Sequence, residues 1–230
     1  MKITTTLTRT LRTRGIRSAL IGIALLAAAG SPAIAGGGNV GNSNIMPPQS
    51  RPHGASYAEW AERFWLWAHG GGTADSPQSG PVWFLASAPF SPDPGFRTIR
   101  NITIPAGTSL FASVLSFFDN NDGVDPPFSD EELIEDANNT FDATAVDTMC
   151  IIDGVPVKGL DDPLESAYRL QTDLYPVTLE DGTTGNEVAV GEFVMIKPLR
   201  VGQHTVRLIG SINVGILLSK DVTYNITVTP

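Results

Sequence analysis

A strict alternation of apolar and polar residues near the end of the chain sets the fold class. Val222, Tyr224, Ile226 and Val228 alternate with threonine and asparagine side chains, which is the pattern of a strand with one buried and one exposed face. Further strand-like segments precede it at 149–152, 155–157, 175–179, 192–197, 204–209 and 212–218. Strands that follow one another at roughly ten-residue spacing, with no helix between them, are typical of antiparallel sheets.

Three segments in the first half of the chain predict further strands. The run at 81–86 is wholly apolar, which is typical of a strand buried on both faces. A strand at 99–104, a Pro-Ala-Gly turn and another apolar run at 109–118 follow it. We therefore expect a mainly β domain, an antiparallel β-sandwich of the immunoglobulin-like or jelly-roll-like kind. The chain shows no internal repeat and no linker long enough to divide it, so a single domain at 56–230 is expected after a flexible leader at 36–55.

Two segments carry helix signals instead. In 56–69, Ser56 and the glutamate three residues later have the spacing of a capping box, aromatic and alanine residues recur at helical spacing, and three glycines follow. In 129–139, Ser129 opens a shorter acidic helix in the same way. We expect the aromatic helix to pack on the sheet, because apolar residues at helical spacing usually form core. If they were exposed, the same tryptophans would suit sugar stacking or a partner groove.

The first 35 residues have the three zones of a cleavable export signal. Lys2 and four arginines form a basic start, an apolar run follows at 19–29, and the Ala-Ile-Ala sequence at 33–35 fits a signal peptidase site. The apolar run is shorter than the roughly 20 residues that a membrane-spanning helix needs, so a permanent anchor is the weaker interpretation. We expect a periplasmic or secreted protein that begins near Gly36 and has no membrane span after cleavage.

Without the signal, the chain has 10 Lys and Arg against 24 Asp and Glu, a net charge of −14. Such an acidic surface repels phosphate backbones and anionic membranes, so nucleic acid is not an expected partner. Cys150 is the only cysteine and lies in an apolar, strand-like run, which predicts a buried, inert thiol and no internal disulfide. About 195 residues can build a core without one, since a chain of that size buries roughly 70% of its unfolded surface.

Several segments together resemble a group of uncharacterised exported bacterial proteins. They are SYAEW (56–60), FWLW (64–67), VWFLA (82–86), IPAGTSLF (104–111), GQHTV (202–206) and VTYNITV (222–228). The resemblance spans most of the chain after the signal and implies an exported protein. It implies no activity, cofactor or site residue, because none is attached to that group. The closing strands also resemble the end of immunoglobulin-like sandwiches at the level of fold.

No catalytic or cofactor motif stands out in the sequence. It lacks a G-x-S-x-G elbow, since the run at 107–111 ends in Phe, and it lacks an H-E-x-x-H or paired-cysteine metal site, a phosphate-binding glycine loop and a dinucleotide fingerprint. The histidines are His53, His69 and His204. Because they are scattered, we interpret them as structural, and His204 as a half-buried, hydrogen-bonded residue on a strand.

The loop at 119–128 is rich in Asp and Asn and is the candidate metal site. Asp119, Asn121, Asp122 and Asp125 can supply oxygen ligands to calcium, which takes six to eight of them. The register departs from the standard helix-loop-helix site, because the glycine stands fifth and an aspartate stands twelfth. A solvated turn followed by an acidic helix cap accounts for the same residues. Two interpretations therefore stay open: calcium, or no cofactor.

These observations favour a non-enzymatic exported domain, structural or binding, with a protein or a glycan as its partner. The alternative is an extracytoplasmic hydrolase that acts on a glycan or similar polymer, through two facing carboxylates. An exposed aromatic patch would indicate binding, whereas a deep cleft with two or more carboxylates of shifted pKa would indicate an enzyme.

Overall fold

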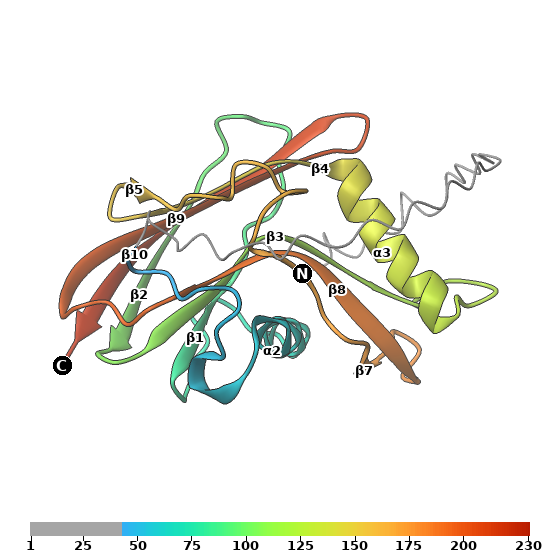
Figure 1. Ribbon diagram of the computed structural model, residues 1–230, viewed down its shortest axis with the longest axis horizontal. Helices are drawn as coiled ribbons and strands as arrows, with labels where there is room; N and C mark the ends of the chain where they lie inside the picture. The colour runs from blue at the N-terminus through green and yellow to red at the C-terminus, as the bar shows by residue number, and fades with distance from the viewer. Residues whose placement is uncertain (1–42) are drawn as a thin grey trace, which may run out of the picture.

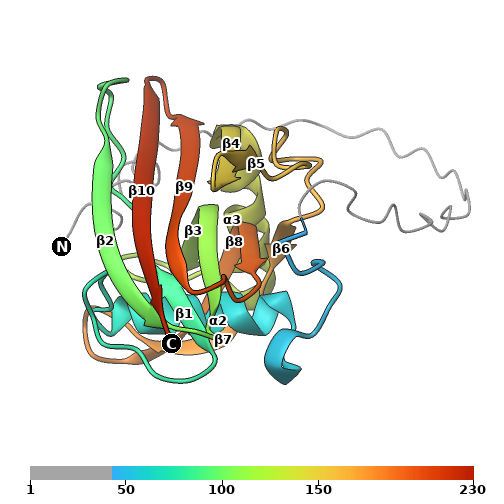
Figure 2. The ribbon, with the colours of Figure 1, turned by 90° about the vertical axis from the view of Figure 1, so that its left-hand side faces the viewer.

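The computed structural model describes residues 43–230, in which two β-sheets pack face to face with two α-helices (Figure 1). The first sheet has the strand order β1-β3-β8-β6, with β7 also paired to β8, and the second has the order β2-β10-β9-β4-β5 (Figure 2). The strands are β1 (Val82–Leu85), β2 (Thr98–Pro105), β3 (Ser109–Asn120), β4 (Ala145–Ile152), β5 (Val155–Pro156), β6 (Arg169–Gln171), β7 (Tyr175–Thr178), β8 (Thr184–Ile196), β9 (Gly202–Asn213) and β10 (Leu217–Thr229). The expected export signal at 1–35 lies outside the described residues.

The prediction of a mainly β fold is confirmed, but the sheets are mixed, so an antiparallel sandwich is not confirmed. β1 runs parallel to β3 and β2 runs parallel to β10, while the other strand pairs of residues 43–230 are antiparallel. After β1 the chain crosses to the second sheet as β2 and returns as β3, so two changes of direction leave β1 and β3 parallel. Side chains alternate in the same way in both kinds of pair, and the sequence pattern therefore does not reveal strand direction.

Both predicted helices are present. A short 3-10 turn, η1 (Pro52–Gly54), precedes α2 (Tyr57–His69). Ser56 Oγ accepts a hydrogen bond from Glu59 N (3.2 Å), and the Glu59 carboxylate accepts one from Ser56 N (2.6 Å), which is the expected capping box. The second helix, α3 (Asp130–Thr144), begins with the same arrangement and continues past its predicted end, because the last turn buries Phe141. None of the helices in residues 43–230 is long and apolar enough to cross a membrane.

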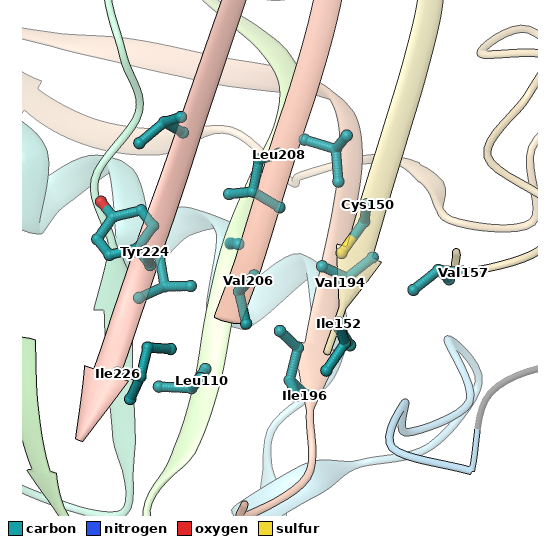
Figure 3. Packing of buried hydrophobic residues seen from close by; sticks show 14 of the residues in the cluster. Leu110, Cys150, Ile152, Val157, Val194, Ile196, Val206, Leu208, Tyr224 and Ile226 are labelled. Carbon is teal, nitrogen blue, oxygen red and sulfur yellow. The ribbon is translucent and has the colours of Figure 1, made fainter. Parts of the chain in front are cut away.

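The main core lies between the two sheets (Figure 3). Figure 3 shows its members from the first sheet, Leu110, Val194 and Ile196, with those from the second, Cys150, Ile152, Val206, Leu208, Tyr224 and Ile226. Cys150 is buried and free, as predicted. Burial raises the pKa of its thiol to about 12, because the thiolate would lose its hydration, so the group is unreactive.

The other face of the first sheet is covered by α2, and α3 fills the space where the two sheets diverge (Figure 1). Phe111 of β3 and Phe193 of β8 stack with their ring centres 5.6 Å apart, and Phe64 of α2 packs edge-on against both. Trp60 is also buried. The aromatic residues of α2 therefore contribute to the core, as expected from their spacing.

Residues 43–55 are the described part of the expected leader, and 44–46 pair with the end of β8. Met46 N donates a hydrogen bond to Met195 O (2.9 Å), and Lys197 N donates one to Asn44 O (2.7 Å). Ile45 forms an isolated bridge with Ile196 and is buried. The Gly, Asn and Pro content of this segment gives no periodicity from which such pairing could be predicted.

Candidate functional site

A cavity of about 380 Å³ lies beside β3, where the neighbouring strand β1 ends. β1 pairs only with residues 109–112 of β3, so the edge of β3 from Ser113 onward has no strand beside it within residues 43–230. The last turns of α2, the segment 86–90, α3 and Lys220 of β10 enclose this edge. The space therefore results from a four-residue strand that lies next to a twelve-residue one.

Most of the cavity wall is apolar. Its aromatic residues are Phe64, Trp65, Trp67, Phe90, Phe117 and Phe118. Gly72, just after α2, leaves room for the Trp67 ring, because a Cβ on Gly72 would lie 2.2 Å from Trp67 Cε2. An apolar wall around a volume in the range of roughly 300–1,000 Å³ is typical of sites for small molecules.

Lys220 is the basic residue that lines the cavity, and it is 3% exposed. It occupies the buried face of β10, in phase with Val222 and Tyr224. The residue opposite it on β9 is Gly210. A Cβ on Gly210 would lie 3.2 Å from Lys220 Cε and 2.9 Å from a backbone carbonyl of β3, so the glycine leaves space for the lysine side chain.

The amine of Lys220 has uncharged neighbours. Its Nζ donates a hydrogen bond to Ser87 Oγ (2.8 Å) and lies 5.6 Å from the centre of the Phe90 ring. Within the described part of the chain, no carboxylate lies within ion-pair distance of it. Burial lowers the pKa of Lys220 from 10.5 to about 7, because desolvation disfavours the ammonium. Near neutral pH the amine therefore exists in both forms.

Ser87 is held in place by contacts with the second sheet. Arg100 of β2 donates a hydrogen bond from Nη2 to Ser87 O (2.8 Å) and another from Nη1 to Tyr224 Oη (2.7 Å). Ser91 exchanges two backbone hydrogen bonds with Ser219 of β10 (2.8 and 2.9 Å). The segment that carries Ser87 is thus fixed against β2 and β10, which positions its hydroxyl beside Lys220.

The remaining polar groups of the wall include hydroxyls, an indole and two acids. Ser113 Oγ and Ser116 Oγ lie 2.6 Å apart. The indole Nε1–H of Trp65 is buried and has no hydrogen-bond acceptor among residues 43–230. Asp119 and Asp136 are the acidic residues that line the cavity.

A second cavity, of about 630 Å³, adjoins the first, and Phe118 lines both. Its central group is Glu187, which is fully buried. His69 Nε2 and Tyr175 Oη lie 2.8 Å and 2.6 Å from one carboxylate oxygen, and Asn120 Nδ2 donates to the other (2.9 Å). Burial and the adjacent carboxylate raise the pKa of Tyr175, so its hydroxyl stays a donor. Because its oxygens are satisfied, Glu187 is explained as a link between α2, β3, β7 and β8.

The structure gives the predicted calcium ligands separate roles. Asp119 is buried at the end of β3, and Asp125 is exposed. The side-chain amide of Asn121 exchanges two hydrogen bonds with the backbone of Phe128 (2.9 and 3.0 Å), and Asp122 Oδ1 accepts one from a backbone amide after β7 (2.7 Å). No three His, Cys, Asp or Glu side chains within residues 43–230 are grouped so as to hold a metal ion. Calcium binding stays a prediction.

Two of the histidines form contacts at the surface of the sheets. His53 Nε2 lies 3.0 Å from Ser109 Oγ. His204 contacts the Asp153 carboxylate (2.8 Å) and Arg200 O (2.9 Å). Burial opposes the charged form of His204, but the contacts with Asp153 and Arg200 raise its pKa. These hydrogen bonds are those of structural residues.

Sequence reasoning missed Lys220 and Ser87. A signal for the lysine exists in the alternation of β10, because position 220 is in phase with the apolar residues at 222, 224, 226 and 228. A lysine at a core position of this kind is rare without a partner. No sequence signal marks Ser87, which joins the site only through the fold.

Comparisons with known proteins add no assignment. No protein-family model matches the chain, and no curated protein or solved structure was found to be similar to it.

Proposed function

We propose that the chain is an exported, non-enzymatic binding domain, whose ligand is a small and largely apolar molecule held in the cavity beside β3. The observation that carries this proposal is the buried amine of Lys220, which lines an apolar cavity and has no carboxylate partner among residues 43–230. Export is supported by the signal-like sequence of the first 35 residues. Mass spectrometry of the extracytoplasmic protein tests it, and an intact Met1 would contradict it.

Burial of the Lys220 amine lowers the stability of the folded chain, and a purely structural residue at this position would not need to do so. Lowering its pKa from 10.5 to about 7 corresponds to about 5 kcal/mol, at about 1.4 kcal/mol per pKa unit. An apolar side chain of similar length would fill the same place without this cost. Shifted ionisable groups in cavities are common at functional sites, because a ligand can supply the missing interaction.

A polymer-binding face is less well supported than the cavity. Stacking on a glycan needs exposed aromatic rings, whereas Trp60 and Phe64 of α2 are buried and Trp65 and Trp67 line the cavity. The hydrolase alternative needs two free carboxylates that face each other. In the larger cavity, the carboxylate of Glu187 already accepts three hydrogen bonds. A small-molecule site therefore explains the apolar cavity and its buried lysine better than a glycan-binding face or a hydrolase site does.

Titration with the uncharged fluorescent probe N-phenyl-1-naphthylamine tests the proposal. We expect saturable binding by the mature protein and a change in tryptophan emission, because Trp65 and Trp67 line the cavity. Thr140→Phe places a large ring in the cavity wall and should weaken binding at least about tenfold, which is about 1.4 kcal/mol. The matched control Asn139→Phe alters an exposed neighbour on α3 that does not line the cavity. Equal binding by both variants would refute the proposed site.

A further inference from the structure

Two side chains of the cavity wall, Lys220 and Trp65, offer buried hydrogen-bond donors. A lysine ammonium has three N–H donors, and Lys220 directs one to Ser87 Oγ. The Trp65 indole N–H, which has no acceptor within residues 43–230, adds a further donor in the same wall. A ligand that completes these groups must therefore bring acceptor oxygens.

Within residues 43–230 the cavity wall contains one basic residue, so it can pair with one negative group of a ligand. Lys220 is the basic residue that lines the cavity, and it comes from β10. Asp136 of α3 also lines the cavity, and its carboxylate would repel a second anionic group. The remaining contacts are apolar and aromatic. The charge pattern thus fits a molecule with a single anionic end and an apolar body.

We infer that the ligand is an amphipathic monocarboxylic acid, whose carboxylate pairs with the ammonium of Lys220 while its alkyl or aryl body fills the cavity beside β3. This inference rests on the proposed function and names the chemical class of its ligand. A planar carboxylate has oxygens enough for both Lys220 and a second donor such as the Trp65 indole. A phosphate dianion would need more positive charge than one lysine supplies.

Pairing with Lys220 makes the binding of a carboxylic acid depend on pH. In the free protein the pKa of Lys220 is about 7, because the amine is buried. A bound carboxylate favours the ammonium, so binding above neutral pH takes up about one proton. Affinity should be highest near pH 6, where the ligand is a carboxylate and Lys220 is mostly an ammonium, and should fall by about tenfold per pH unit above pH 7. An uncharged analogue has no such linkage.

Other titratable groups packed around the cavity must be distinguished from Lys220. They are Asp119 at the end of β3 and Asp136 on α3. The wall residues from β9 and from the segment 86–90 carry no charge: Ile212, Ser87 and Phe90. Asp221, the next residue on β10, is engaged by Arg97 (2.7 Å) and Arg207 (2.6 Å). The Asp136→Asn variant therefore serves as the control for a carboxylate origin of any pH effect.

Isothermal titration with octanoate and methyl octanoate between pH 6 and pH 9 tests the inference. We expect octanoate to bind about 100-fold more weakly at pH 9 than at pH 6, with methyl octanoate unchanged. In Lys220→Met the ester should still bind, while octanoate should lose both its advantage at pH 6 and its pH dependence. Suberate, which adds a second carboxylate, should bind at least about tenfold more weakly than octanoate, a difference of about 1.4 kcal/mol.

Contrary outcomes separate this inference from the proposed function. If the ester and the acid bind equally at pH 6, the cavity binds apolar molecules but the carboxylate assignment is wrong. The same conclusion follows if the pH dependence persists in Lys220→Met or disappears in Asp136→Asn. If octanoate fails to bind while N-phenyl-1-naphthylamine binds, the carboxylate class is again excluded. If neither octanoate nor methyl octanoate nor N-phenyl-1-naphthylamine binds, the proposed function itself is refuted.

Discussion

The replacement Glu192→Gln should remove a pH dependence of folding that the structure places between pH 4.5 and pH 7. Glu192 lies on β8, is fully buried, and has no hydrogen-bond donor to either oxygen within residues 43–230. The nearby hydroxyl of Thr148 donates to Leu160 O, and that of Ser166 donates to Gly159 O (2.9 Å). The carboxylate is therefore poorly solvated, and its neutral form is favoured.

Burial raises the pKa of Glu192 from 4.5 to about 7, against the opposing influence of the Ser166 and Thr148 hydroxyls. Between these values the folded chain keeps a proton that the unfolded chain has lost, so stability falls as pH rises. The benefit is fully present below pH 4.5 and is lost by about pH 7. At about 1.4 kcal/mol per pKa unit, the loss amounts to about 3 kcal/mol.

Urea unfolding of the mature protein, followed by tryptophan fluorescence at pH 4.5, 6, 7 and 8, measures this effect. The free energy of unfolding of Glu192→Gln, relative to wild type, should increase by about 3 kcal/mol from pH 4.5 to pH 8. The control Glu165→Gln removes an exposed carboxyl with the same change in net charge, so it separates burial from charge. A difference for Glu192→Gln that is constant with pH, or equal to that of the control, would refute the reasoning.

Three other predictions concern the core, the cavity and the acidic loop. Trp60→Ala should lower the free energy of unfolding by about 3–5 kcal/mol, since Trp60 is buried and its Nε1 donates to Pro52 O (2.9 Å); an unchanged urea midpoint would contradict this. The free energy of unfolding of wild type should rise from pH 7 to pH 10, because Lys220 keeps its proton in the unfolded chain and loses it in the folded one. Lys220→Met should lack this rise in the same assay. Melting curves in calcium, magnesium, sodium and chelator should coincide for wild type and Asp122→Ala, because the loop side chains already bond to backbone groups. A rise of several degrees in calcium alone would instead establish the metal site.

Features that depend on neighbouring residues were predictable from the sequence. The capping boxes at Ser56 and Ser129 and the alternation in β10 are set by contacts within a few residues, and the structure contains all of them. The parallel pairing of β1 with β3 and of β2 with β10 depends on which distant segments meet. Local periodicity carries no information about such pairing, so the expectation of antiparallel sheets followed only from the absence of helices between strands.

The candidate site was harder to predict than the fold, because its polar groups come from distant segments. Lys220 lies on β10, Ser87 lies in the segment after β1 and Trp65 lies on α2, and no spacing in the sequence connects them. The acidic loop was the candidate metal site in the sequence, because its oxygen-bearing residues are adjacent there. In the structure, side chains of this loop form hydrogen bonds with the backbone; Asn121, for example, bonds to the backbone of Phe128. Adjacent polar residues are often used in this way, because short side chains compete for nearby backbone groups.

The cavity itself depends on residues that are small or absent rather than on a motif. β1 ends after four residues and leaves the edge of β3 open, Gly210 leaves room for the lysine side chain, and Gly72 allows the Trp67 ring to lie against it. A larger residue at Gly72 or Gly210 would clash with Trp67 or with the Lys220 side chain, so both glycines are needed for the cavity wall to have this form. The coincidence of these features around one buried lysine is the reason why we propose a binding site here rather than a packing defect. The same logic offers a search rule for related sequences: a lysine in the buried phase of the last strand, opposite a glycine, should accompany a short first strand.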